Sequence, residues 1–205
     1  MRIELEKIGK RYHRDWIFRN VDLRLESGEK WSFLGANGSG KSTLMKVISG
    51  YTLFTEGQLN YFLGDQEIAH DRIYSHLTIA APYLDLAEDM TLEEAYHFHQ
   101  QFKPFPSDMT FTRFADLLDI HHRNNSLAHF SSGMRQRVKL ALAIISDTPL
   151  VFLDEPCTNL DLQGIAWYHQ LVQDYGQAKC IIVCTNRPEE EAPFAEKSIR
   201  MTDYK

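Results

Sequence analysis

The stretch "GANGSGKST", Gly35 to Thr43, has residue types and spacing that suit a chain of phosphates. It fits the Walker A pattern G-x-x-x-x-G-K-[ST], whose glycines let backbone N–H groups approach phosphate oxygens without a side-chain clash. A strand-like segment, "KWSFL", precedes it, and a helix-like segment follows, which is the context that the pattern requires. We expect Lys41 to bridge the β- and γ-phosphates, Ser42 to ligate Mg²⁺ and Thr43 to support the phosphates. The residues predicted to bind nucleotide in this loop are Gly35, Asn37, Gly38, Ser39, Gly40, Lys41, Ser42 and Thr43.

A second motif is the run "LVFLDEP", Leu150 to Pro156, in which four apolar residues end in two acids. This is the form of a Walker B strand. A buried parallel strand that ends in this way places both carboxylates at the carboxyl edge of the sheet, beside the phosphate loop. We expect Asp154 to hold the Mg²⁺ shell and Glu155 to polarise the water that attacks the γ-phosphate.

A third motif, "FSSGM", Phe130 to Met134, stands just ahead of an amphipathic helix. A Ser/Gly turn that opens a helix offers free N–H groups and the positive end of the helix dipole, and both suit an anion. The apolar stripe of this helix is Val138, Ala141, Leu142 and Ile145. The chain therefore carries two candidate phosphate cradles.

The elements that must position these motifs follow from the apolar patterns. Alternating residues in "RIELEKI" and "VDLRLE" predict antiparallel, half-exposed strands, and the apolar runs "LVFLD" and "KCIIVCT" predict buried parallel strands. No strand signal is found from about Thr91 to Ile145, where a capping box of Thr91 and Glu94 opens a helix at Leu92. The apolar face of that helix is predicted to be Leu92, Ala95, Tyr96 and Phe102. We predict an α/β fold with a mainly parallel sheet, an antiparallel N-terminal part and an inserted helical subdomain.

The order of these parts resembles the nucleotide-binding domain of ATP-binding-cassette (ABC) ATPases. The resemblance runs from about Ile3 to Met201 and rests on "GANGSGKST", on "FSSGM" followed by "RQR", on "LVFLDEP" and on "TNLD". It implies one ABC ATPase domain over residues 1–205 on a P-loop NTPase core. The core is expected at about 1–81 and 149–205, and the helical subdomain at about 82–148. The implied cofactors are ATP and Mg²⁺.

The resemblance also explains the second cradle. In this family two domains meet head to tail, and each ATP lies between the Walker loop of one and the signature loop of the other. Ser131 and Gly133 are the expected contacts to the γ-phosphate of the partner's ATP, although Phe130, Ser132 and Met134 replace the usual Leu, Gly and Gln. The loop expected to cross the dimer interface comprises Asn159, Leu160 and Asp161, and Asp161 also suits a helix N-cap.

Three further positions concern the base and the chemistry. By the resemblance, Tyr12 stacks on adenine; the alternative is a surface tyrosine after a strand. The family's Gln at the junction of core and helical lobe falls near Pro82, and no Gln is found there. Asn186 stands where the family has a switch His, and a neutral amide cannot act as an acid. We therefore expect Asn186 to act as a catalytic residue together with Glu155. We also expect slow hydrolysis and a solvated Arg187 side chain.

Composition limits the partners. The net charge is −6 with no Lys/Arg run, so no nucleic-acid partner is expected. We expect no signal peptide, the sequence has no apolar window of membrane-span length, and three cysteines are no disulfide framework. We expect a cytoplasmic protein, peripheral on the inner face of the membrane, that pairs with a second copy or a paralogue and drives a separate transmembrane subunit. The alternatives are a soluble non-transport ABC ATPase and a slow ATP-binding regulatory module.

Overall fold

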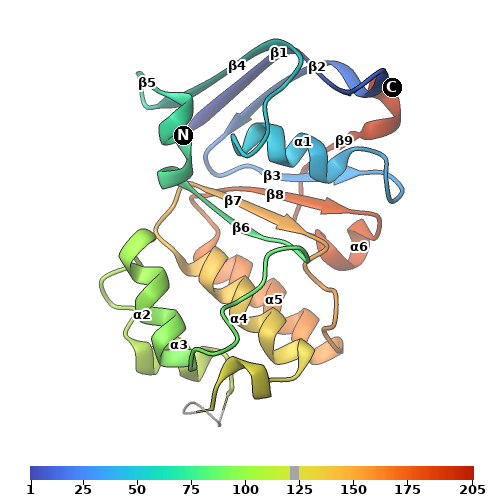
Figure 1. Ribbon diagram of the computed structural model, residues 1–205. Coiled ribbons are helices and arrows are strands. Elements are labelled where there is room, and N and C mark those ends of the chain that lie inside the picture. The colour runs from blue at the N-terminus through green and yellow to red at the C-terminus, as the bar shows by residue number, and fades with distance from the viewer. Residues whose placement is uncertain (121–124) are drawn as a thin grey trace.

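The computed structural model describes residues 1–120 and 125–205, and in these ranges the strands form two sheets (Figure 1). One is antiparallel, in the order β2-β1-β4-β5, and the other is parallel, in the order β6-β7-β8-β3-β9. The antiparallel strands are β1 (Arg2–Tyr12), β2 (Asp15–Glu26), β4 (Glu56–Leu63) and β5 (Gln66–Ile68). The parallel strands are β3 (Lys30–Leu34), β6 (Leu77–Ala80), β7 (Leu150–Asp154), β8 (Cys180–Thr185) and β9 (Lys197–Arg200). The predicted combination of a parallel sheet with an antiparallel N-terminal part is confirmed.

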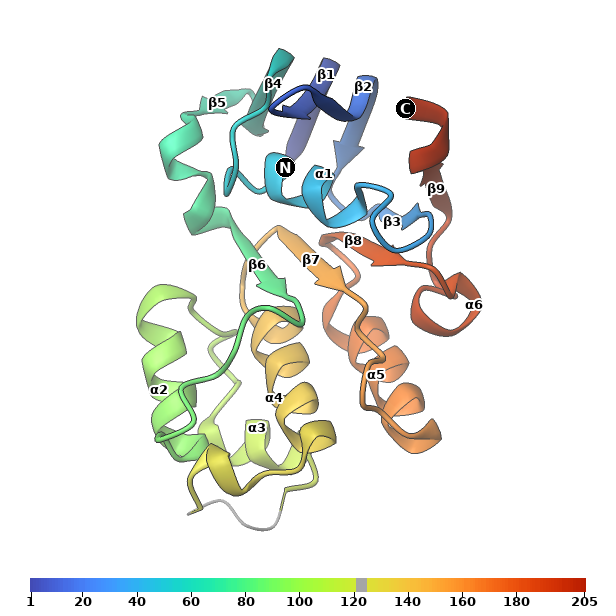
Figure 2. The same cartoon turned by 45° about the vertical axis from the view of Figure 1, so that its right-hand side comes forward.

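Helices cover both faces of the parallel sheet. The α-helices are α1 (Lys41–Ile48), α2 (Leu92–Phe102), α3 (Phe111–Leu117), α4 (Ser132–Ile145), α5 (Leu162–Tyr175) and α6 (Pro188–Glu191). The 3₁₀ turns are η1 (His70–His76), η2 (Leu127–His129) and η3 (Met201–Tyr204). Figures 1 and 2 show α1 on one face of this sheet and α4 and α5 on the other. Within the described ranges, no helix is long and apolar enough to cross a membrane.

The central strands explain why their sequences are apolar without interruption. Along β7, Leu150 and Phe152 pack into the hydrophobic cluster that contains α1 and the antiparallel sheet. Val151 and Leu153 pack into the cluster that contains α2, α4 and α5. Because successive side chains of a strand point to opposite faces, a strand between two helical layers needs an apolar residue at every position.

The inserted helices lie between β6 and β7 in the chain and share their core with α5. The predicted capping box is confirmed, since Thr91 Oγ1 accepts from the Glu94 N–H and the Glu94 carboxylate accepts from the Thr91 N–H. The predicted face is wrong at Phe102, which is 63% exposed and packs edge-on against Phe98. Phe102 is the last residue of α2, beyond the layer that buries Tyr96. The subdomain boundaries near residues 82 and 148 remain a prediction.

The N-terminal hairpin is longer than the alternating pattern predicted. β2 begins at Asp15 rather than near Val21, and register shifts interrupt its pairing with β1. Lys7 and Asn20 have φ values of 49° and 55°, the left-handed conformation found at bulges. Each bulge shifts the alternation by one residue, so the pattern is lost before Val21. The extension carries Ile17 to the Walker loop.

Candidate functional site

The Walker loop connects β3 to α1 and needs glycine at two of its positions. Gly40, the N-cap of α1, has φ 109°, a conformation that side chains disfavour, and a Cβ there would lie 2.9 Å from Ile17 Cγ2. A Cβ on Gly35 would collide with Ser39 Oγ. The loop therefore packs too closely against Ile17 and Ser39 for a side chain at either glycine.

Two side chains of the loop fit a bound phosphate. Lys41 is only 5% exposed, and its Nζ donates to the carbonyls of Gly35 at 2.7 Å and Ala36 at 3.2 Å. Ser39 Oγ is buried and has no hydrogen-bond partner among the described residues. The first N–H groups of α1 also lack partners within the helix. An anion bound in the loop would accept hydrogen bonds from these groups. The residues therefore fit the nucleotide phosphates that the sequence predicts.

The two acids of the Walker B strand lie beside this loop. Asp154, the last residue of β7, is 5% exposed and forms a hydrogen bond with Ser42. Burial, and to a smaller degree the charge of Glu155, raises the pKa of Asp154. In the part of the chain that the structure describes, no cluster of three or more His, Cys, Asp or Glu side chains forms a metal cage. One carboxylate and one hydroxyl fit Mg²⁺, which usually keeps waters and substrate phosphates as its other ligands.

Glu155 turns out of the strand into the site. Its φ is 47°, a left-handed conformation that is uncommon for a residue with a side chain, and its N–H donates to the Cys184 carbonyl at 3.0 Å. With the Walker loop it lines a cavity of about 200 Å³. The residues that line this cavity are Ile17, Asn37, Gly38, Gly40, Lys41, Ser42, Thr43 and Glu155. The cavity thus brings six of the predicted phosphate-binding residues together with Glu155 and adds Ile17, which sequence reasoning missed. It does not include the predicted residues Gly35, Ser39, Asp154 and Asn186.

Tyr12 is not among the residues that line this cavity. It ends β1, is 46% exposed, and pairs with Asp15 across the hairpin. The Lys10 ammonium lies 4.6 Å from the centre of its ring and donates to the Leu53 carbonyl at 2.7 Å. The ring is thus held on one side by a cation, and its stacking on adenine stays a prediction.

The switch position lies at the end of β8, next to β7. Asn186 is exposed and follows Thr185, in a register that pairs Asp154 with Cys184. Arg187 is not simply solvated, as expected from the sequence, but forms ion pairs with Glu190 at 2.9 Å and Glu191 at 3.1 Å in the helix that follows it. Glu191 is fully buried and also accepts from the Thr185 hydroxyl; burial raises its pKa. In this network the Arg187 guanidinium pairs with two glutamates of α6. Asn186 is then the exposed polar side chain that directly follows β8.

The second cradle is a separate cavity of about 420 Å³ at the start of α4. It is lined by Ser131, Ser132, Gly133, Met134, Arg137, Asn159, Leu160 and Asp161. The helix begins at Ser132, so Gly133 lies in its first turn, and Ser131 is the N-cap that accepts from the Met134 N–H at 3.2 Å. Asp161 caps α5, as expected. The two cavities share no lining residue: one lies at the start of α1 and the other at the starts of α4 and α5, helices that cover opposite faces of the parallel sheet (Figure 2).

The fold and these motifs define a class. A glycine-rich loop between a parallel strand and a helix, with acids at the end of a second strand that one further strand, β8, separates from the first, is the architecture of P-loop NTPases. The family model described as "ABC transporter" matches residues 18–158, which is more than half of the chain. The protein therefore belongs to the ABC transporter family, as an ABC-type ATPase with the ATP-binding domain of that family.

Known relatives agree with this assignment. The chain is 29% identical over 186 residues to a putative ABC transporter ATP-binding protein, AlbC, of Bacillus subtilis, covering 86% of this chain and 77% of that protein. A putative ABC transporter ATP-binding protein from Pyrococcus furiosus superposes with a TM-score of 0.83 at 17% identity, over 100% of this chain and 99% of that one. A bacterial ABC transporter cassette, solved as a dimer, superposes with a TM-score of 0.79 at 22% identity, covering 97% and 94% of the two chains.

Proposed function

We propose that this chain binds MgATP, dimerises head to tail around it, and hydrolyses it to drive a separate membrane subunit. The observation that carries the proposal is the pair of separate cradles. The cavity at Lys41 and the cavity at Ser131 share no lining residue, and they lie at the starts of helices that cover opposite faces of the sheet. One chain cannot bring both of its cradles onto a single nucleotide. In a pair of chains related by a twofold axis, the Lys41 cradle of each chain can face the Ser131 cradle of the other, with one nucleotide between them.

Each residue of the proposed site has a task set by its position. Lys41 supplies positive charge to the phosphates, and the N–H groups of the Walker loop hold them. Ser42 and Asp154 would hold Mg²⁺, which neutralises charge on the β- and γ-phosphate oxygens when bound. Glu155 orients and polarises the attacking water, and Asn186 hydrogen-bonds the γ-phosphate or that water. Ser131 and Gly133 of the second copy complete the enclosure.

The dimer is tested by a variant that keeps the shape of the site and removes the base. Glu155→Gln should bind ATP without consuming it and should form a dimer that light scattering detects. Adding Lys41→Ala to this variant should prevent the dimer, because the phosphates lose their main counter-charge. If the Glu155→Gln variant stays monomeric at saturating MgATP, both alone and with a membrane partner present, the head-to-tail proposal is wrong.

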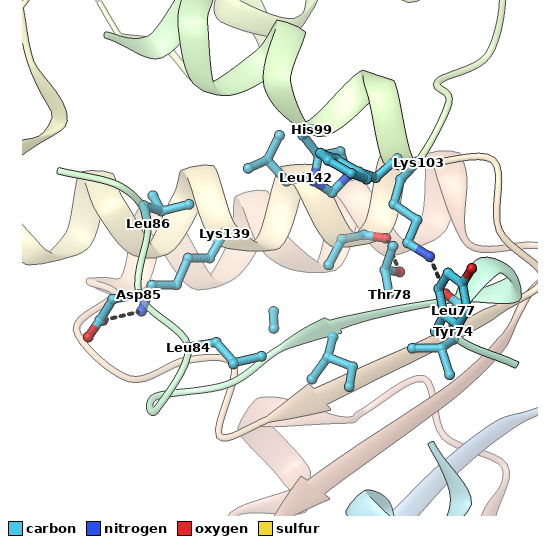
Figure 3. A pocket seen from close by; sticks show the side chains of 14 residues that line it. Tyr74, Leu77, Thr78, Leu84, Asp85, Leu86, His99, Lys103, Lys139 and Leu142 are labelled. Atoms are coloured by element: carbon cyan, nitrogen blue, oxygen red, sulfur yellow. Dashed lines mark hydrogen bonds and ion pairs between the residues drawn. The ribbon is translucent and has the colours of Figure 1, made fainter. Parts of the chain in front are cut away.

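The membrane subunit has a candidate docking groove, which Figure 3 shows from close by. The groove has a volume of about 420 Å³ and lies between β6, the segment that follows it, and helices α2 and α4. Its apolar lining includes Leu84, Leu86, Phe102 and Leu142. Lys139 pairs with Asp85 at 3.2 Å at one end, and Lys103 donates to the Tyr74 carbonyl at the other. These features suit a short helix with an apolar face, and the protein would then lie in the cytoplasm on the inner face of the membrane.

Docking is tested by changing the floor of the groove. Leu84→Glu should prevent co-purification with a multi-span membrane protein encoded beside this chain and should leave ATP binding intact. Retained co-purification would move the contact to another surface.

A slow ATP-binding regulatory module is the second candidate. It is favoured by the neutral Asn186 and by the pairing of Arg187 with Glu190 and Glu191, which leaves no cation from this loop for the γ-phosphate. A turnover so slow that the wild-type dimer persists for hours would support this candidate. Rapid dimer dissociation that follows hydrolysis would support the motor.

A further inference from the structure

The segment after β6 runs past the proposed metal site. β6 and β7 are parallel, with Ala80 opposite Leu153, so the chain that leaves β6 passes beside Asp154. Pro82 and Tyr83 come next, and the family's Gln is missing here. The chain lines the groove of Figure 3 along β6 and again from Leu84 onward. Tyr83 is thus the first large polar side chain between the nucleotide site and the groove.

The side chain of Tyr83 lies against α1. The Lys46 ammonium is 4.0 Å from the centre of its ring, the distance of a favourable cation–π contact. Lys46 follows Ser42 by four residues, so both lie on the same face of α1. Since Ser42 hydrogen-bonds Asp154, this contact places Tyr83 beside the face of α1 that carries the proposed metal ligand, although Tyr83 does not itself line the cavity of the Walker loop.

The electrostatics agree with this placement. Burial raises the pKa of Tyr83, and the Asp154 carboxylate raises it further, so the hydroxyl remains a hydrogen-bond donor at neutral pH. The same Lys46 charge acts on Asp154, where it favours the ionised carboxylate. Tyr51 also approaches Lys46, at 5.9 Å, but it is 71% exposed compared with 44% for Tyr83.

We propose that Tyr83 is a positioning residue for the metal–nucleotide complex, whose hydroxyl donates to the oxygens on the metal side of the γ-phosphate. The inference rests on the proposed function, because it needs MgATP in the Walker loop. An O–H donor held by Lys46 takes the place of the missing side-chain amide. The contact is expected only when the bound metal fixes the γ-phosphate next to the Tyr83 hydroxyl, so it should stabilise the nucleotide bound with its metal and not the metal-free nucleotide.

The test compares nucleotide affinity with and without the metal. Calorimetry with a non-hydrolysable ATP analogue gives the affinity in Mg²⁺ and in a chelator. Tyr83→Phe keeps the ring on Lys46 and removes only the hydroxyl. It should reduce the gain in affinity that Mg²⁺ produces by at least about tenfold, the size of one hydrogen bond to a charged group, and leave the metal-free affinity unchanged. The matched control, Tyr51→Phe, removes the hydroxyl of the more exposed tyrosine near Lys46 and should change neither value.

Two results would overturn the inference alone: an unchanged Mg²⁺ gain in Tyr83→Phe, or an equal loss of affinity with and without the metal. If the parent protein binds the analogue but gains no affinity from Mg²⁺, the MgATP site itself is wrong and the inference falls with it. The parent measurement thus separates the two failures.

Discussion

Substituting Gly133 by Ala probes the second cradle with a single methyl group. A Cβ at this position would lie 2.9 Å from the Asn159 carbonyl oxygen, about half an ångström closer than ordinary van der Waals contact. The clash is with backbone, and Asn159 already has a φ of 65°, so the helix start and the facing loop must move apart. Alanine favours the helix by up to about 1 kcal/mol over glycine, which offsets much of the strain in the folded monomer.

The substitution should therefore weaken dimerisation more than it lowers the stability of the folded monomer. Moving the first turn of α4 weakens a charge-assisted hydrogen bond worth about 1.5–3 kcal/mol, and it does so at both sites of a symmetric dimer. In the Glu155→Gln background we expect Gly133→Ala to weaken ATP-dependent dimerisation at least tenfold, about 1.4 kcal/mol. The free energy of unfolding should change by less than about 1 kcal/mol.

The assay is light scattering over a range of protein concentrations at saturating MgATP, with urea unfolding of the same samples. His129→Ala, which removes an exposed side chain outside the lining of the second cradle, is the matched control and should still dimerise. If Gly133→Ala dimerises as tightly as its parent, the start of α4 does not contact the partner's nucleotide.

Three further predictions test other parts of the site and fold. Lys41→Ala should lose MgATP affinity at least tenfold, about 1.4 kcal/mol, and an unchanged affinity by calorimetry would refute the Walker A assignment. Asn186→Ala should lower turnover at saturating MgATP and Asn186→His should raise it; an alanine variant as fast as the parent would place Asn186 away from the γ-phosphate. Burial, and then the charge of Lys103, lowers the pKa of His99 from 6.5 to about 4, so the unfolded chain binds the proton more tightly. Stability is then complete above pH 6.5 and falls toward pH 4 by up to about 3 kcal/mol, a loss that His99→Gln should remove from urea unfolding curves.

Local signals made much of the fold predictable. The Thr91–Glu94 capping box starts α2 at the predicted residue, because the box satisfies its own helix end without help from tertiary contacts. The apolar runs of β7 and β8 are buried on both faces, which only a strand between two layers requires. Such signals lie within a few residues of the element that they specify.

The errors arose where tertiary context decides. The exposure of Phe102 depends on where the neighbouring layer ends, which helical periodicity does not contain. The bulges at Lys7 and Asn20 displaced the alternation of the hairpin and so hid Ile17. The pairing of Arg187 with the buried Glu191 depends on the turn into α6, a short helix that carries no periodic signal.

The candidate site shows the same division. The Walker loop and the acids of β7 were predicted residue by residue, because their chemistry needs a fixed spacing along the chain. Tyr83 was not predicted to have a role at the metal, since its position depends on the parallel pairing of β6 with β7 and on Lys46 of α1. Contacts between distant segments become visible only once the sheet order is known.

The most direct test of the central claim mixes two defective chains. In the Glu155→Gln background, Lys41→Ala damages the first cradle and leaves the second intact, and Gly133→Ala does the reverse. A head-to-tail pair of unlike chains would contain one fully intact nucleotide site and one doubly damaged site. We predict that a 1:1 mixture with MgATP forms dimers holding one ATP per pair, at concentrations where each variant alone stays monomeric. A mixture that dimerises no better than its components would contradict the claim that each chain closes on the nucleotide of another.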